Sequence, residues 1–81
     1  MITIVHNGHV IKIKAFSFFT GKETIWYDEK VVSTKHSIAG STHIFNVEEE
    51  KTVQYEVEIG ARSFGCYVTV RRDGKLIYSD R

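Results

Sequence analysis

The sequence predicts an all-β protein, a small antiparallel β-sandwich of about eight short strands joined mainly by hairpins. Three observations lead to this prediction. The segment from Thr52 to Ile59 alternates apolar and polar residues, as a strand with one buried and one exposed face does. Asn7-Gly8 and Asp73-Gly74 are the residue pairs that tight hairpin turns prefer. No segment shows the period of an amphipathic helix.

The first half of the chain contains four expected strands, at 1–6, 9–19, 23–28 and 31–36. Apolar residues along 9–19 occupy odd positions at first and even positions from Phe16 on, which predicts a bulge or a corner. Glu29 stands where a tight turn prefers glycine, so we expect a type I turn with a bulge, or strain. Val31 and Ser33 are expected to share a face, with Val31 directed inward.

The second half contains four further strands, expected at 42–47, 52–59, 66–72 and 75–79. Between the first two of these, the acidic run 48–51 is interpreted as a solvated loop rather than a cation site. No internal sequence repeat is evident. The predicted core consists of Ile4, Ile11, Ile13, Phe18, Ile25, Tyr27, Val31, Phe45, Val47, Val53, Tyr55, Val57, Ile59, Val68, Val70 and Ile77.

Length and composition favour one domain spanning residues 1–81, which buries roughly 60% of the surface of its unfolded chain. A single cysteine, Cys66, forms no internal disulfide, which fits a reducing compartment, and we expect a cytoplasmic location. No apolar run reaches signal-peptide or membrane-span length, so we expect neither secretion nor a membrane span. The net charge of +1 argues against a nucleic-acid partner.

Segments 9–13, 21–30, 45–47 and 55–59 together resemble the N-terminal β-sandwich of the Fas apoptotic inhibitory molecule family. The resemblance covers most of the chain from His9 onward and implies a compact antiparallel sandwich. That family is described as anti-apoptotic and as protecting proteins from aggregation, with no known catalytic residues. Glu29 departs from the family pattern, which has glycine there, and the family's second domain has no counterpart. No functional motif is available to match residue by residue, so the family's role is not transferred.

No residue set indicates catalysis, and we predict a non-enzyme without a cofactor or a metal. His6 and His9 flank a turn, but the four histidines lack the spacing of zinc ligands. Cys66 has no predicted helix N-terminus or nearby base to lower its pKa, so it is interpreted as a small buried apolar residue. Glu56 and Glu58 share one face and do not oppose each other across a cleft.

Aromatic residues, which make up 12% of the chain, are the most suggestive functional feature. Trp26 lies between Ile25 and Tyr27, so bulky groups occupy both faces of one strand. We therefore predict a protein-interaction module that binds a protein partner or a second copy of itself. The expected contacts are an aromatic patch around Trp26 and Phe19, with Phe64 as a second candidate anchor, or an open sheet edge. The alternatives are that loops cover these rings, or that the rings line a cavity that carries a small apolar ligand.

Overall fold

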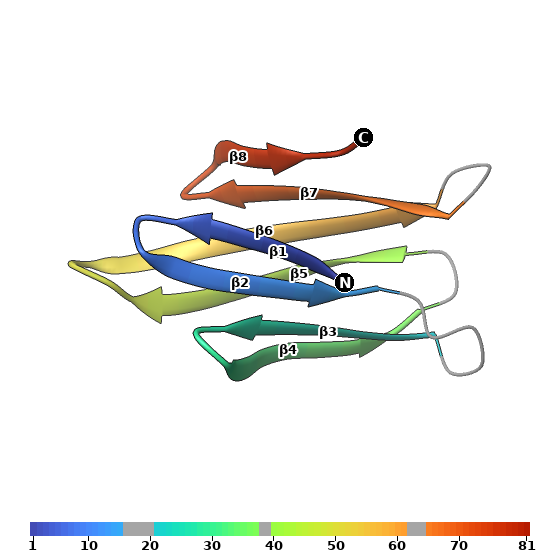
Figure 1. Ribbon diagram of the computed structural model, residues 1–81, viewed down its shortest axis with the longest axis horizontal. Helices are drawn as coiled ribbons and strands as arrows, with labels where there is room; N and C mark the ends of the chain where they lie inside the picture. Colours follow the sequence, from blue (N-terminus) through green and yellow to red (C-terminus); the bar gives the residue numbers. More distant parts are fainter. Residues whose placement is uncertain (16–20, 38–39, 62–64) are drawn as a thin grey trace. The chain divides into compact units, whose positions relative to one another are not determined.

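The computed structural model describes residues 1–15, 21–37, 40–61 and 65–81 (Figure 1). These residues form eight β-strands and no helix. The strands are β1 (Ile2–His6), β2 (His9–Lys14), β3 (Lys22–Tyr27), β4 (Lys30–His36), β5 (Gly40–Glu48), β6 (Thr52–Ala61), β7 (Cys66–Arg72) and β8 (Lys75–Ser79). The predicted all-β antiparallel class is confirmed. The bulge or corner predicted near Phe16 lies outside the described residues.

The chain divides into two compact units, Met1–Ile38 and Ala39–Arg81. Each unit is built on one four-stranded antiparallel sheet, with strand order β1-β2-β3-β4 in the first and β5-β6-β7-β8 in the second (Figure 1). Strands that are adjacent in a sheet are therefore always consecutive in sequence. Both sheets are meanders built from hairpins, as the turn signals predicted.

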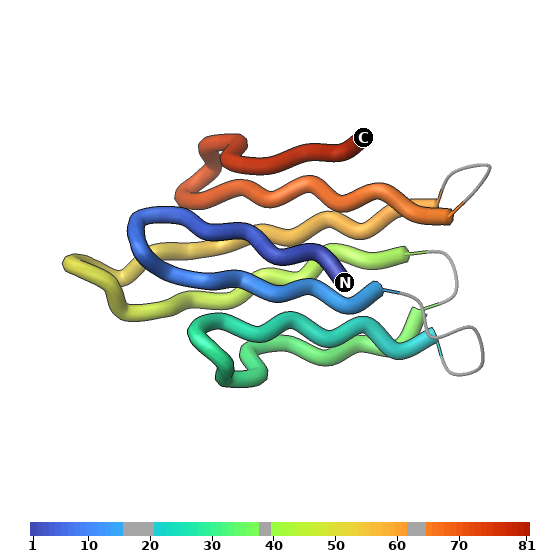
Figure 2. The backbone as a smooth tube through the Cα atoms, in the orientation of Figure 1, coloured from blue at the N-terminus to red at the C-terminus, as the bar shows by residue number. Residues whose placement is uncertain are grey.

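Three of the hairpins turn on two residues with left-handed backbone, visible as tight reversals of the tube in Figure 2. Asn7-Gly8 has φ of 51° and 79°, and Asp73-Gly74 has φ of 49° and 82°. Asp28-Glu29 adopts the same geometry, with φ of 47° and 70°, although neither residue is glycine. Positive φ at both positions rules out the expected type I turn, and backbone strain is present because a β-carbon disfavours positive φ.

The two sheets share one internal plan, which is clearest at the aspartates Asp28 and Asp73. The Asp28 N–H donates to the Val10 carbonyl at 2.8 Å, and Asp28 Oδ1 accepts from the Val10 N–H at 2.8 Å. Asp73 forms the same two bonds with Gln54, at 2.8 and 2.9 Å. Each aspartate thus ties its turn to the second strand of its sheet. The chain has a structural repeat that was not evident in its sequence.

A β-bulge follows the Asp28-Glu29 turn. The register passes from Ile25 opposite Ser33 to Trp26 opposite Val31, so Val32 has no partner of its own on β3. One extra residue reverses the face to which the following side chains point. Val31, before the bulge, lies opposite Trp26 on the outer face and is 58% exposed, whereas Ser33, after it, lies opposite the buried Ile25. The prediction that Val31 belongs to the core was wrong for this reason.

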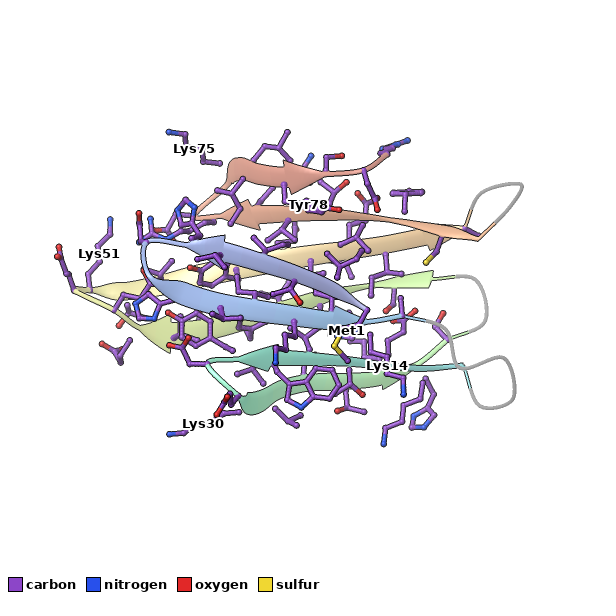
Figure 3. The ribbon with its side chains drawn as sticks, in the orientation of Figure 1. Met1, Lys14, Lys30, Lys51, Lys75 and Tyr78 are labelled. Carbon is purple, nitrogen blue, oxygen red and sulfur yellow. The ribbon has the colours of Figure 1, made fainter. Side chains whose placement is uncertain are left out.

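The hairpin of the second sheet has the same bulge at the equivalent place. Its register passes from Val70 opposite Tyr78 to Arg71 opposite Leu76, which leaves Ile77 as the extra residue. Leu76 occupies the position that Val31 has in the first sheet, and it is likewise exposed, at 53%. Lys30 and Lys75 begin β4 and β8 and are labelled in Figure 3.

Each sheet has one buried face. The buried apolar residues are Ile11, Ile13, Ile25, Tyr27, Phe45, Val53, Tyr55, Val57, Ile59, Val68 and Val70. All of them belong to the predicted core. Ile4, Val47 and Ile77 are half-buried, and Phe18 lies outside the described residues. Four buried polar residues were not anticipated: Glu23, Thr24, His43 and Thr69.

Candidate interaction surface on the first sheet

Trp26 lies on the outer face of the first sheet. Its neighbours Ile25 and Tyr27 are buried on the opposite face, while Trp26 is half-buried. The strand therefore carries bulky groups on both faces, as its sequence predicted. Trp26 stands opposite Lys12 on β2 and opposite Val31 on β4. The register on the turn side of the β-bulge places Val31 on this face, so an exposed aliphatic side chain lies next to the tryptophan.

The outer face of this sheet forms one continuous surface, here called the Trp26 face. One row of cross-strand partners spans all four strands and consists of Thr3, Lys12, Trp26 and Val31. In the next row, Val5 stands opposite Val10. Val5 is 69% exposed. The members of the Trp26 face are Thr3, Val5, Val10, Lys12, Trp26 and Val31. Three valines and Trp26 thus lie around Lys12, and Lys14 follows on the same face, further from the Asp28-Glu29 turn.

Two open hollows indent the Trp26 face near the Asp28-Glu29 turn. One has a volume of about 360 Å³ and is lined by Val10, Lys12, Asp28 and Glu29. The other has a volume of about 320 Å³ and is lined by Met1, Lys12, Trp26 and Glu29. Lys12 and Glu29 line both hollows, so these two charged side chains stand where the hollows meet.

Asp28, which lines the first hollow, is held in place by contacts with its neighbours. His9 Nδ1 lies 2.7 Å from Asp28 Oδ2, and the His9 ring stacks on Tyr27 with centroids 5.2 Å apart. Asp28 is thereby fixed through both carboxylate oxygens, one to His9 and one to the backbone of Val10. Glu29 follows in its strained backbone conformation. Strained residues persist where the surrounding structure holds them, and they are common at functional sites.

Lys12 and Glu29 differ from Asp28 in their electrostatic environment. Within the parts of the chain that the structure describes, neither the Lys12 ammonium nor the Glu29 carboxylate has a hydrogen bond or an ion pair. Their charges are therefore available to a partner. An unpaired lysine and an unpaired glutamate beside a tryptophan can recognise an apolar group that is flanked by charges of both signs.

Of the three residues predicted for the site, only Trp26 falls among the described residues. Phe19 and Phe64 lie outside the described residues, so the structure does not test their place in an aromatic patch. His6 and His9 are paired across their hairpin. Cys66, half-buried, begins β7.

Two further features of the described residues concern metals and membranes. In the ranges that the structure describes, no three His, Cys, Asp or Glu residues converge as a metal site would require. The same ranges contain no helix that could cross a membrane. The predictions of a non-enzyme without cofactors stay predictions.

The second sheet contains a buried polar cluster that the sequence did not reveal. Glu49 Oε2 accepts from the Tyr55 hydroxyl at 2.7 Å, and Glu49 Oε1 accepts from Arg72 Nη2 at 2.8 Å. Only 6% of the Glu49 side chain is exposed, so Glu49 is not part of a solvated acidic loop as predicted. Burial raises the pKa of Tyr55 to about 12, and the hydrogen bond to the Glu49 carboxylate adds to the rise. A single glutamate in an acidic run carries no sequence signal for such a role.

Comparisons with protein families, with curated proteins and with solved structures find no match to this chain. The fold and the surface define an all-β protein of two four-stranded meanders, one of which has a partly apolar outer face with two hollows. The resemblance to the Fas apoptotic inhibitory molecule family stays a prediction.

Proposed function

We propose that this chain is a non-catalytic protein-interaction module that binds a protein partner through the Trp26 face. The observation that carries the proposal is the position of Trp26, half-buried beside a 58% exposed Val31 and lining an open hollow. Tryptophan is enriched among residues that dominate binding energy, and grouped exposed apolar side chains mark interaction sites. A cytoplasmic location, supported by the single cysteine, belongs to the same proposal.

The chemistry of the surface defines the partner it fits. Trp26, Val31 and the walls of the hollows favour an apolar or aromatic anchor side chain. Lys12 and Glu29, both without a partner among the described residues, favour an acidic group and a basic group beside that anchor. The partner is therefore a folded or extended protein segment that presents an apolar side chain between opposite charges.

The decisive experiment compares variants of the two sheets. Trp26→Ala should abolish capture of a partner from the lysate of the native host, and Val31→Ala should weaken it. Leu76→Ala is the matched control, because Leu76 occupies the position of Val31 in the second sheet. With the captured partner purified, Trp26→Ala should raise Kd by roughly 30-fold, the effect of a strong hot spot. Leu76→Ala should leave Kd within about twofold of the parent chain.

Two results would contradict the proposal. If Trp26→Ala unfolds the chain, the ring belongs to the core and the Trp26 face is not an interaction surface. If Trp26→Ala and Leu76→Ala bind the partner as tightly as the parent, the Trp26 face is not the binding surface. Charge reversal of Lys12 and of Glu29, one at a time, separates electrostatic recognition from apolar packing. Each reversal should weaken binding more at low salt than at high salt.

The hollow beside Trp26 favours one alternative function, the carriage of a small apolar ligand. Its volume of about 320 Å³ falls at the lower end of the range for small-molecule sites. Trp26 is the sole tryptophan, so a ligand that enters this hollow should change the emission of the protein. Titration with fatty acids and carbohydrates tests this directly. Unchanged emission throughout the panel would leave the protein-interaction module as the better proposal.

A further inference from the structure

β1 forms an open edge of the first sheet. Among the strands described, β2 is the only one to which β1 is hydrogen-bonded. An edge strand presents a row of main-chain donors and acceptors to any other strand, so proteins usually protect such edges with charged side chains. β1 lacks this protection, because its sequence is Ile-Thr-Ile-Val-His.

The other edge strands differ from β1 in charge. β4 carries Lys30 and Lys35, β5 ends in Glu48, and β8 begins with Lys75. Like charges brought together oppose the pairing of two such edges. β1 is therefore the edge strand of the described sheets that offers no electrostatic barrier to a second copy of itself.

The hydrogen bonds of Val10 show which main-chain groups of β1 face the open side. Val10 donates its N–H to Asp28 Oδ1 and accepts from the Asp28 N–H through its carbonyl. Both groups of Val10 thus point away from β1, so Val5, which stands opposite Val10, is not hydrogen-bonded to it. In an antiparallel pair the direction alternates from residue to residue. The N–H and C=O groups of Val5 and Thr3 therefore point to the open side, and those of Ile4 point to β2.

We propose that two copies of this chain associate through antiparallel pairing of β1 with β1, centred on Ile4. This register places Ile4 opposite its own copy, and Thr3 of each chain opposite Val5 of the other. The outward groups of Thr3 and Val5 then meet in two hydrogen-bonded pairs, which provide roughly four main-chain hydrogen bonds. The inference deepens the proposed interaction role, with a second copy as the partner. It uses the main-chain groups of Thr3 and Val5 at the β1 edge, although the side chains of these two residues belong to the Trp26 face.

In this register the faces of the two copies' first sheets also match. Ile2, Ile4 and His6 are half-buried on one side of β1, and Thr3 and Val5 are exposed on the other. Pairing centred on Ile4 keeps half-buried residues beside half-buried residues. The first sheets of the two copies therefore join into one continuous sheet. Val5, 69% exposed in the single chain, gains the second copy's Thr3 as a cross-strand neighbour. One short strand gives a small interface, so association is weak and depends on concentration.

The test uses two double variants that add the same number of charges to β1. Thr3→Lys with Val5→Lys places like charges opposite each other across the interface and should abolish association. Thr3→Lys with Val5→Glu places opposite charges there and should retain it. Sedimentation equilibrium from roughly 5 to 500 μM, with nothing added before Met1, should show the parent mass doubling toward the upper end, an interval chosen for weak complexes. Trp26→Ala should associate as the parent does.

Hydrogen exchange gives a second readout that specifies the strand. The amides of Thr3 and Val5 should exchange more slowly as concentration rises, while that of Ile4 is already protected by β2. A monomeric parent at the highest concentration overturns the inference, and so does equal association of the two double variants. These results leave the role of the Trp26 face untouched, because that role is tested by partner capture. Loss of capture by Trp26→Ala, in turn, has no effect on the β1 result.

Discussion

Asp28 and Asp73 occupy the same position in the two sheets, and each forms one main-chain and one carboxylate hydrogen bond with the second strand of its sheet. Asp73→Ala removes the acceptor for the Gln54 N–H and a residue type that tolerates φ of 49°. We expect a loss of about 1–3 kcal/mol in the free energy of unfolding. Asp73→Asn keeps an acceptor oxygen and the tolerance of positive φ, so it should lose less than half as much.

Urea unfolding of the two Asp73 variants distinguishes this role from that of an ion pair. Lys51 Nζ lies 3.8 Å from Asp73 Oδ2, but both side chains are exposed, so this pair contributes little. If Asp73→Asn loses as much stability as Asp73→Ala, the charge of Asp73, and not its hydrogen bond to Gln54, is what stabilises the turn.

Glu29 and Gly74 are equivalent turn positions, and they make a matched pair for measuring strain. Glu29→Gly should raise the free energy of unfolding by about 0.5–1 kcal/mol, because glycine adopts φ of 70° without a steric penalty. Gly74→Ala should lower it by about 1 kcal/mol, since φ there is 82° and a β-carbon would contact nothing else. Thermal and urea unfolding of both variants measure the two effects. A destabilised Glu29→Gly would show that the Glu29 side chain contributes more than its backbone costs.

Tyr55 makes stability depend on alkaline pH. Its pKa in the folded chain is raised to about 12, first by burial and then by the hydrogen bond to Glu49. A folded-state pKa above the unfolded value gives stability that is complete below about pH 10 and lost as pH rises toward 12. Tyr55→Phe should cost about 1–3 kcal/mol at pH 8, because Glu49 loses a buried donor.

The gap in stability between the parent and Tyr55→Phe should therefore narrow between pH 10 and pH 12. Tyr78, whose pKa is raised by burial and by Asp80, is present in both proteins and cancels in the comparison. Urea unfolding at several pH values measures the gap. A gap that stays constant throughout this interval would show that Tyr55 does not titrate as its environment implies.

Gly60 leaves room for the ring of Tyr67, its cross-strand partner on β7. A β-carbon at Gly60 would overlap this ring, which also lies under the Arg81 guanidinium at 5.0 Å. Gly60→Ala should therefore cost about 1–3 kcal/mol. The same substitution in a Tyr67→Ala background should cost much less, and a double-mutant cycle by urea unfolding measures the difference. Equal costs in both backgrounds would rule out the ring as the cause.

The sequence predicted the buried faces well wherever strands alternate regularly. Val53, Tyr55, Val57 and Ile59 are all buried because a strand of unbroken period two can present only one set of side chains to the core. Val31 shows the limit of this reasoning. A β-bulge separates Val31 from Ser33, so these two residues do not share a face as regular alternation predicts, and no residue type marks the position of the bulge.

The burial of polar residues could not be predicted from the sequence. His43 and Glu23 occupy inward positions on their strands, but a polar residue in an alternating segment reads as an exposed one. The repeat of the two meanders also escaped detection, because it depends on hydrogen bonds of Asp28 and Asp73 rather than on extended identity. For the Trp26 face, the sequence indicated the tryptophan, whereas the two hollows and the exposed Val31 follow from tertiary geometry.

The meander topology has a consequence for how the chain reaches its native state. Every pair of adjacent strands is consecutive in sequence, so no pairing has to wait for a distant segment to arrive. The entropy lost in closing each hairpin is that of a short loop. We expect this chain to fold faster than a β-protein of similar length with crossed connections, because each pair of hydrogen-bonded strands in the described sheets is local in sequence. Each sheet can grow by the addition of one strand at a time to a hairpin already formed.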